Sequence, residues 1–127
     1  MNGPLFLSLQ QVDDLHDRAL DAFGGSPGIR DKGLLASAVN QPQNDYFYGD
    51  ADLCGIAAAY CFHIAEAQAY LDGNKRAAVA AALTFLASNG VSIDFDSQVL
   101  YSAMIALANK QIGKQELGAL FRVLTSG

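Results

Sequence analysis

The chain has 127 residues, of which 51% are apolar and 17% are charged. This length suits one compact domain spanning residues 1–127, and the composition excludes a disordered chain. The net charge of −5 excludes a general nucleic-acid binder, so we expect no DNA binding by the chain alone, although a local phosphate site stays open.

Two helices are predicted in the first part of the chain. Ser8 and Gln11 have the spacing of a capping box, and apolar residues then recur at helical spacing as far as Phe23. Asp31 is placed to cap a second, short helix that we expect to end near Val39. The Gly- and Pro-containing stretch between the two helices is typical of a loop.

The segment from Asn40 to Asp50 interrupts the helical pattern. It combines a proline, a glycine and short polar side chains with three consecutive aromatic residues, Tyr46, Phe47 and Tyr48. Such a composition predicts a loop. Its aromatic rings either fold back onto the core or belong to a short, hairpin-like flap that contacts a partner, and the sequence leaves both interpretations open.

Two helices with apolar residues on nearly every side follow, over residues 52–70 and 75–88. A helix of this kind belongs in the middle of a domain, and the many alanines of the second helix allow close approach of its neighbours. Asn89 and Gly90 form a typical helix end. These two segments therefore predict a central helix pair.

The last part of the chain predicts two more helices. Asp96 is placed to cap a helix that runs to about Asn109, and Gly113 separates it from a final helix over residues 114–124. Together, the segments predict an all-α bundle of about six helices, in which the others surround the central pair.

The cysteines and the apolar stretch at 53–71 indicate in which cellular compartment the protein is expected. Cys54 and Cys61 are two helical turns apart, roughly 10.5 Å of rise, which is too far for a disulfide. No signal peptide is recognisable, and the apolar stretch contains polar side chains that do not suit a membrane span. We expect a soluble, cytoplasmic protein with reduced cysteines and no membrane partner.

The link between the two central helices carries the clearest chemical signal. Asp72, Gly73 and Asn74 suit a tight turn, because Gly and Asn tolerate left-handed backbone conformations. Lys75 and Arg76 are not explained in this way, since cations at a helix N-terminus oppose the helix dipole. An anion bound between them, on free backbone N–H groups, would explain both. Asp72 can also hold Mg²⁺; the alternative is a solvated turn with two exposed cations.

Residues 72–78, Asp-Gly-Asn-Lys-Arg-Ala-Ala, resemble the core of the Doc signature in the Fic/Doc family, which reads His-x-Phe-x-Asp-Gly/Ala-Asn-Lys-Arg-Thr-Ala. Residues 23–35 resemble the N-terminal half of that family, and residues 83–90 resemble the end of its central helix. The resemblance extends over about residues 7–89 and points to the death-on-curing (Doc) toxin branch. It implies the helical Fido fold with a short flap.

The resemblance also implies an activity. A toxin of this branch would transfer a phosphoryl group from Mg-ATP to a protein hydroxyl, with elongation factor Tu as the expected target, and would thereby inhibit translation. Asp72 would bind Mg²⁺, Gly73 and Asn74 would form the anion-holding turn, and Lys75 and Arg76 would contact the phosphates.

Two partners are implied in the same way. The target's backbone would add as a strand to the flap at residues 40–50. A small antitoxin with a disordered C-terminal segment would fold over the cleft. Fic enzymes that transfer AMP carry a second arginine three residues after the first, and Val79 stands at that position here, which favours the Doc branch.

One departure from the family pattern concerns the general base. The family has a histidine four residues before the motif aspartate, and Gln68 stands there in this chain, while Tyr70 replaces a phenylalanine. An amide can orient a hydroxyl but cannot accept its proton, and loss of a general base slows a reaction by about 10²–10⁴. The chain is therefore a weakened transferase, an impaired domain that binds nucleotide or antitoxin, an AMP-transferring enzyme, or a purely structural domain.

Other titratable residues are weaker candidates for the missing base. His63 lies about 140° around the helix from Gln68, so we expect no substitution by it. We expect His16, on the first helix, to be solvated or half-buried, and Glu66 to face elsewhere. Asp45, in the expected flap, is the remaining nearby carboxylate, with no geometric argument for its participation.

Overall fold

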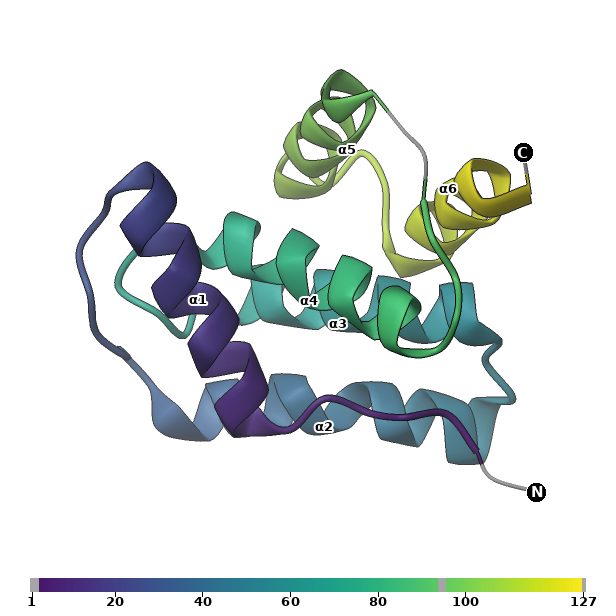
Figure 1. Ribbon diagram of the computed structural model, residues 1–127, viewed down its shortest axis with the longest axis horizontal. Coiled ribbons are helices and arrows are strands. Elements are labelled where there is room, and N and C mark those ends of the chain that lie inside the picture. Colours follow the sequence, from purple (N-terminus) through teal and green to yellow (C-terminus); the bar gives the residue numbers. More distant parts are fainter. Residues whose placement is uncertain (1–2, 94–95, 127) are drawn as a thin grey trace.

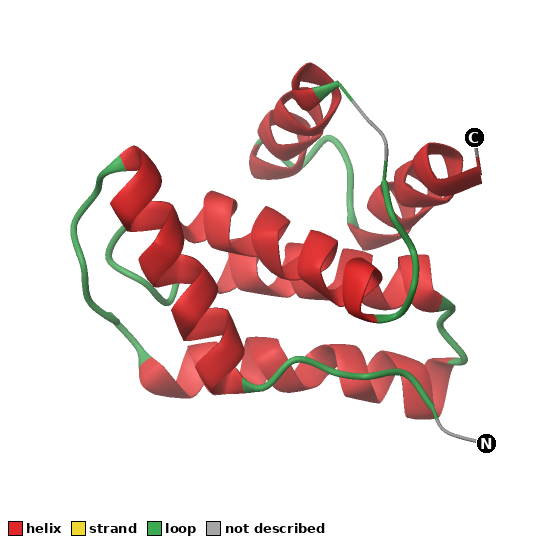
Figure 2. Cartoon of the chain, viewed as in Figure 1, coloured by secondary structure: helices red, strands yellow, loops and turns green. Residues whose placement is uncertain are grey.

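A computed structural model describes residues 3–93 and 96–126, and this part of the chain forms six helices without a strand (Figures 1 and 2). The expected all-α bundle is confirmed. The helices are α1 (Leu9–Phe23), α2 (Lys32–Gly49), α3 (Leu53–Ala67), α4 (Asn74–Ser88), α5 (Ser97–Ala108) and α6 (Lys114–Ser126).

The helices α3 and α4 form the centre of the bundle. In Figure 1 they lie side by side, with α2 on one flank and α5 and α6 on the other. Both helices carry alanines without solvent exposure, whose small side chains allow neighbouring helices to approach closely: Ala57, Ala58, Ala77, Ala78, Ala81 and Ala82. The predicted central pair is confirmed.

Helix α1 begins as the sequence predicts and lies against α4. The Ser8 hydroxyl accepts from the Gln11 N–H at 3.1 Å, and the Gln11 side chain accepts from the Ser8 N–H at 2.8 Å. This reciprocal box satisfies two N–H groups that the helix itself cannot pair. The helix buries Val12 and His16 on the side that faces the bundle.

The predicted loop and flap at residues 40–50 are wrong, because α2 continues through this segment to Gly49. Buried residues recur at helical spacing through Leu35, Val39 and Pro42, and half-buried Tyr46 extends the series. Tyr46 also packs edge-on against Phe6, with 5.8 Å between ring centroids. This burial outweighs the one backbone hydrogen bond that a proline removes. The interpretation in which the aromatic residues fold back onto the core holds for Tyr46, whereas Phe47 and Tyr48 stay exposed.

Helix α3 ends earlier than residue 70 because Gln68 adopts a left-handed conformation, with φ 48° and ψ 42°. The chain then runs extended and pairs with the loop after α1. The Arg30 N–H donates to the Ala69 carbonyl at 2.6 Å, and the Leu71 N–H donates to the Gly28 carbonyl at 3.0 Å. This short antiparallel pairing, centred on Ile29 and Tyr70, fixes the chain just before α4.

Both cysteines are buried and free, as expected from their spacing. Burial raises the pKa of the Cys61 thiol to about 12, so this thiol stays protonated in the core. Within the described ranges, no helix has the length and apolar character that crossing a bilayer requires.

Candidate functional site

The connection between α3 and α4 is held by the side chain of Asn74. Its Oδ1 accepts from the Tyr70 N–H and its Nδ2 donates to the Tyr70 carbonyl, both at 3.0 Å. Gly73 precedes α4 with φ 78°, a conformation that a residue with a Cβ adopts only with strain. The Asn74 amide is thus engaged within the turn, and only its backbone is left for the anion-holding role that the resemblance implies.

Asp72 lies at the outer edge of this turn, exposed but oriented. One carboxylate oxygen accepts from the Gly73 N–H at 2.9 Å, and the other accepts from the Ser26 N–H at 3.2 Å. A Cβ at Gly25 would lie 2.9 Å from the second oxygen, so only glycine fits beside it. The loop after α1 thus positions the carboxylate that the sequence nominates for Mg²⁺.

The side chain of His16 contacts the turn from the buried side of α1. The expectation that it is solvated or half-buried is wrong. It is 2% exposed, its ring stacks on Tyr70 with 3.7 Å between centroids, and its Nε2 lies 2.7 Å from the Asp72 carbonyl oxygen. Because a carbonyl only accepts, Nε2 carries the proton and donates. Position 16 lies one turn after Val12 on the buried stripe of α1, and this periodicity was the signal for its burial.

The hydroxyl of Tyr70 extends the same cluster. It donates to the Asp13 carboxylate at 2.5 Å. Burial, and then this hydrogen bond, raise the pKa of Tyr70 well above its ordinary value, so the phenol stays protonated. Two side chains of α1, Asp13 and His16, therefore hold the chain between α3 and α4 at Tyr70 and Asp72.

The N-terminus of α4 is open and cationic. No side chain caps it, its first turn has no acidic residue, and both Lys75 and Arg76 are exposed. The Arg76 guanidinium lies 4.5 Å from the centre of the Phe23 ring, while the Lys75 ammonium makes no ion pair within the described ranges. Uncapped N–H groups beside two cations are the arrangement that binds a phosphate.

A cleft of about 1060 Å³ opens over this helix end. Its walls come from α1, the turn, α4 and α5. Gln68, Asp72, Gly73, Asn74, Lys75 and Arg76 all line it, so the structure brings together every predicted site residue. Arg18 of α1 adds a third cation, and Leu83, Leu100 and Ile105 form an apolar part.

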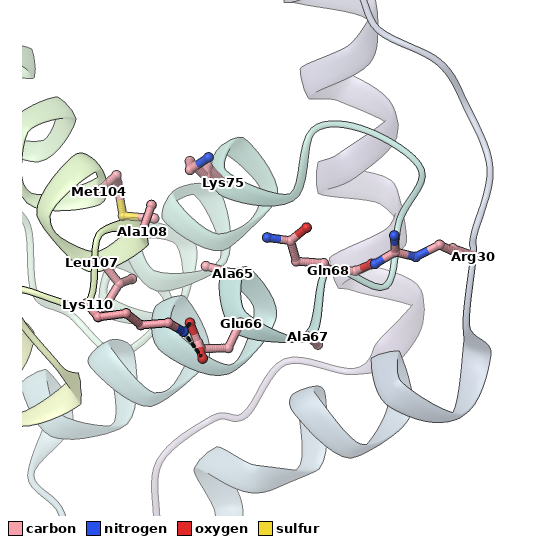
Figure 3. A pocket seen from close by; sticks show the side chains of 10 residues that line it. All are labelled: Arg30, Ala65, Glu66, Ala67, Gln68, Lys75, Met104, Leu107, Ala108 and Lys110. Atoms are coloured by element: carbon pink, nitrogen blue, oxygen red, sulfur yellow. Dashed lines mark hydrogen bonds and ion pairs between the residues drawn. The ribbon is translucent and has the colours of Figure 1, made fainter.

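Gln68 stands where the resemblance to the Doc signature implies a general-base histidine. Its left-handed backbone ends α3, and its carbonyl accepts a hydrogen bond from the Arg30 guanidinium. Its amide side chain points away from Arg30, toward the side of Lys75 (Figure 3). The amide is thus placed to orient a bound group, but it has no basicity with which to take a proton.

The donor set fits Mg²⁺ that arrives with phosphates. The described residues contain no cluster of three or more His, Cys, Asp or Glu side chains that would form a cage for a metal. Mg²⁺ usually takes one or two carboxylates, with substrate phosphates and waters completing its shell. A single exposed carboxylate, Asp72, beside an uncapped helix N-terminus matches that requirement.

The other titratable candidates are engaged elsewhere. Lys114 Nζ lies 2.7 Å from the Asp45 carboxylate and 3.2 Å from His63 Nε2, outside the cleft, so Asp45 is not part of the site. Burial, and then Lys114, lower the pKa of His63 below its ordinary value. Glu66 lies outside the cleft, but it lines a second cavity together with Gln68, so the expectation that it faces elsewhere holds for the cleft only. Both its oxygens contact Lys110 Nζ at 2.9 Å.

The chain is similar to known proteins over most of its length. The model of the Fic/DOC family matches residues 6–86, which include α1, the turn and most of α4. "Protein kinase doc" of Escherichia phage P1 is 31% identical over 119 residues, covering 93% of this chain and 94% of that protein. "Toxin Doc" of Mycolicibacterium smegmatis is 41% identical over 102 residues, covering 77% and 78% of the two chains.

Proposed function

Because the chain belongs to the Fic/DOC family, we propose that it is a Doc-like toxin that transfers a phosphoryl group from Mg-ATP to a protein hydroxyl. The observation that carries this proposal is the uncapped N-terminus of α4, where Lys75 and Arg76 stand beside Asp72. The name of the phage P1 relative supports a kinase activity over the transfer of AMP.

The residues of the cleft have separate roles in binding the donor. The backbone N–H groups at the start of α4 hold phosphate oxygens, and Lys75 and Arg76 offset their charge. Asp72, already oriented by the Gly73 and Ser26 N–H groups, holds Mg²⁺. When bound, Mg²⁺ neutralises charge on the phosphates during transfer.

The transfer step joins the acceptor oxygen to the terminal phosphorus of ATP and breaks the bond from that phosphorus to the bridging oxygen, which leaves with ADP. The acceptor proton goes to solvent or to a phosphate oxygen, because Gln68 cannot accept it. Gln68 orients the hydroxyl instead. Phosphoryl transfer depends mainly on positioning and electrostatics, so a rate reduced by about 10²–10⁴ still leaves activity.

One partner follows from the lining of the cleft, and the other from the resemblance to Doc toxins. Its apolar part, with Leu83, Leu100 and Ile105, suits the C-terminal segment of a small antitoxin that folds on binding and covers the donor site. Elongation factor Tu is the protein target that we propose, with inhibition of translation as the consequence. Residues 40–50 offer no edge for strand addition, because the backbone groups of this segment are used within α2.

The second candidate is a domain that binds nucleotide or antitoxin and catalyses little. It is favoured by one observation, the absence of a basic side chain at position 68. Both candidates use the same cleft, so binding of Mg-ATP alone does not separate them.

Labelled ATP separates the two candidates. The protein is incubated with Mg²⁺, γ-labelled ATP and purified elongation factor Tu or a bacterial extract, beside the Gln68→His and Asp72→Ala variants. Label that appears with wild type and disappears with Asp72→Ala supports the transferase. Label that appears only with Gln68→His supports the binding domain. If no label appears and Mg-ATP also fails to raise the melting temperature, the transferase and the nucleotide-binding form of the second candidate are both wrong, and binding of an antitoxin is what is left.

A further inference from the structure

The residue at the end of α3 has a backbone conformation that a side chain disfavours. Gln68 lies in the left-handed region, with φ 48° and ψ 42°. Among the described residues, only Asp50 and Lys110 are further non-glycine residues with a positive φ. A Cβ in this region crowds the following carbonyl, so the conformation persists where neighbouring groups hold it. The orientation of Gln68 therefore depends on contacts from outside α3.

The loop before α2 supplies those contacts. The N–H groups of Arg30 and Asp31 both donate to the Ala69 carbonyl, at 2.6 and 3.1 Å. These backbone bonds fix the chain one residue beyond Gln68. The Arg30 guanidinium donates to the Gln68 carbonyl itself, and in the described part of the chain this is the one hydrogen bond between the loop and Gln68. The side chain of Arg30 thus holds the residue that the backbone bonds do not reach.

An arginine suits this position for an electrostatic reason. The last carbonyls of a helix have no partner within the helix and carry partial negative charge, so a cation beside them is stabilising. Within the described ranges the Arg30 guanidinium makes no ion pair, so no carboxylate draws it away from α3. Its backbone is held in place because the next residue, Asp31, caps α2 by accepting from the Leu34 N–H at 3.0 Å.

The conformation of Gln68 decides where its amide points. Figure 3 shows the amide directed away from Arg30, toward the side of Lys75. In this orientation Gln68 lines both the cleft and the second cavity, which measures about 390 Å³. If φ changed from 48° to the helical value of about −63°, a rotation of about 110°, the amide would point in a different direction.

We propose that Arg30 is a positioning residue, which holds the Gln68 carbonyl and thereby keeps the Gln68 amide in the orientation that the transfer step uses. This inference rests on the proposed phosphoryl transfer. Arg30 lines the second cavity but not the cleft, so it acts through Gln68 and not on the phosphates. Loss of Arg30 therefore slows the transfer step, whereas binding of Mg-ATP at the start of α4 does not depend on it.

Two substitutions at position 30 test this role. Arg30→Met removes the charge and every donor but keeps a long, unbranched side chain, and Arg30→Lys keeps a cationic donor group. Arg122→Met is the matched control, because Arg122 contacts the other end of α3 through its ion pair with the N-cap residue Asp52. Neither residue of that pair lines the cleft or the second cavity.

The rate of transfer from γ-labelled ATP to elongation factor Tu or to a bacterial extract is measured at saturating Mg-ATP. We expect Arg30→Met to lower this rate about fivefold, because a charge-assisted hydrogen bond at an exposed position is lost, and to leave the Kd for Mg-ATP unchanged. Arg30→Lys should recover most of the rate. Arg122→Met should leave both the rate and the Kd unchanged.

A double substitution shows whether Arg30 acts through Gln68. In a Gln68→Ala background, Arg30→Met should lower the rate no further, because the side chain that Arg30 positions is absent. A merely structural role of Arg30 would lower the rate in both backgrounds. An unchanged rate in Arg30→Met, or the same fall with and without the Gln68 side chain, overturns the proposal.

Nuclear magnetic resonance of Gln68 distinguishes failure of this role from failure of the transferase. In protein labelled with ¹³C and ¹⁵N, the Cα and Cβ signals of Gln68 report its backbone conformation, and its side-chain NH₂ signal reports the amide. If these signals move in Arg30→Met but not in Arg122→Met, and no variant transfers label, Arg30 positions Gln68 and the transferase fails. If label is transferred while the signals stay in place in Arg30→Met, the role of Arg30 fails and the transferase holds. If neither is seen, both fail.

Discussion

The His16 hydrogen bond to the Asp72 carbonyl allows a quantitative test of how the turn is held. In the His16→Phe variant, the ring can still stack on Tyr70, but a ring carbon replaces the donor that now lies 2.7 Å from the carbonyl oxygen. A carbon approaches an oxygen only to about 3.3 Å, so the turn must shift. Loss of one hydrogen bond lowers the free energy of unfolding by about 1 kcal/mol.

For a domain of this size, that loss corresponds to a fall in melting temperature of about 4 °C. In wild type the turn is ordered before the nucleotide binds, whereas in the variant binding of the nucleotide must order it. If this costs about another 1 kcal/mol, the Kd for Mg-ATP rises about fivefold. Thermal unfolding measures the first quantity, and titration calorimetry with Mg-ATP measures the second.

Tyr60→Phe is the matched control. The buried Tyr60 hydroxyl accepts from the Leu7 N–H at 2.8 Å, away from the cleft, so its loss removes a comparable hydrogen bond without touching the turn. We expect a similar loss of stability with an unchanged Kd. The reasoning is refuted if His16→Phe binds Mg-ATP as wild type does, or if Tyr60→Phe weakens binding equally.

Three further predictions concern single residues. Gln68→His restores a general base and raises the rate of phosphoryl transfer by about 10²–10⁴ in the labelled-ATP assay; an unchanged rate would mean that position 68 does not face the acceptor. Gly73→Ala places a Cβ on a backbone with φ 78° and 3.3 Å from His16 Nε2, so the free energy of unfolding should fall by about 1–2 kcal/mol in chemical denaturation. Gly49→Ala is the control, because a Cβ there has no atom within 4 Å, and it should not lower the free energy of unfolding. Because the pKa of His63 is lowered in the folded state, the unfolded chain binds a proton at this residue more readily, and the free energy of unfolding falls as pH falls below 6.5. His63→Gln should flatten this part of the plot of stability against pH. An unaltered slope would contradict the lowered pKa of His63.

Much of the fold follows from local patterns in the sequence. The capping box at Ser8 and Gln11, the N-caps at Asp31 and Asp96, and the two apolar central segments are read from spacing alone. Each is found in the structure, although the first central helix ends at Ala67 rather than near residue 70. These features depend on residues within one or two helical turns of each other. Local chemistry therefore decides them.

The errors arise where distant contacts decide the structure. Pro42 lies inside α2 because its helix is held against α3 and Phe6 covers Tyr46, and no local rule anticipates this. The same holds for His16, whose partner Asp72 is 56 residues away in the chain. The motif residues were recognisable from the sequence, whereas the side chains that support them were not.

The most direct test is a crystal structure of the protein with Mg²⁺ and a non-hydrolysable ATP analogue. We predict that a phosphate contacts the backbone N–H groups at the start of α4 and the side chains of Lys75 and Arg76, with Mg²⁺ on Asp72. A nucleotide bound elsewhere, with this helix end left without phosphate, would contradict the account.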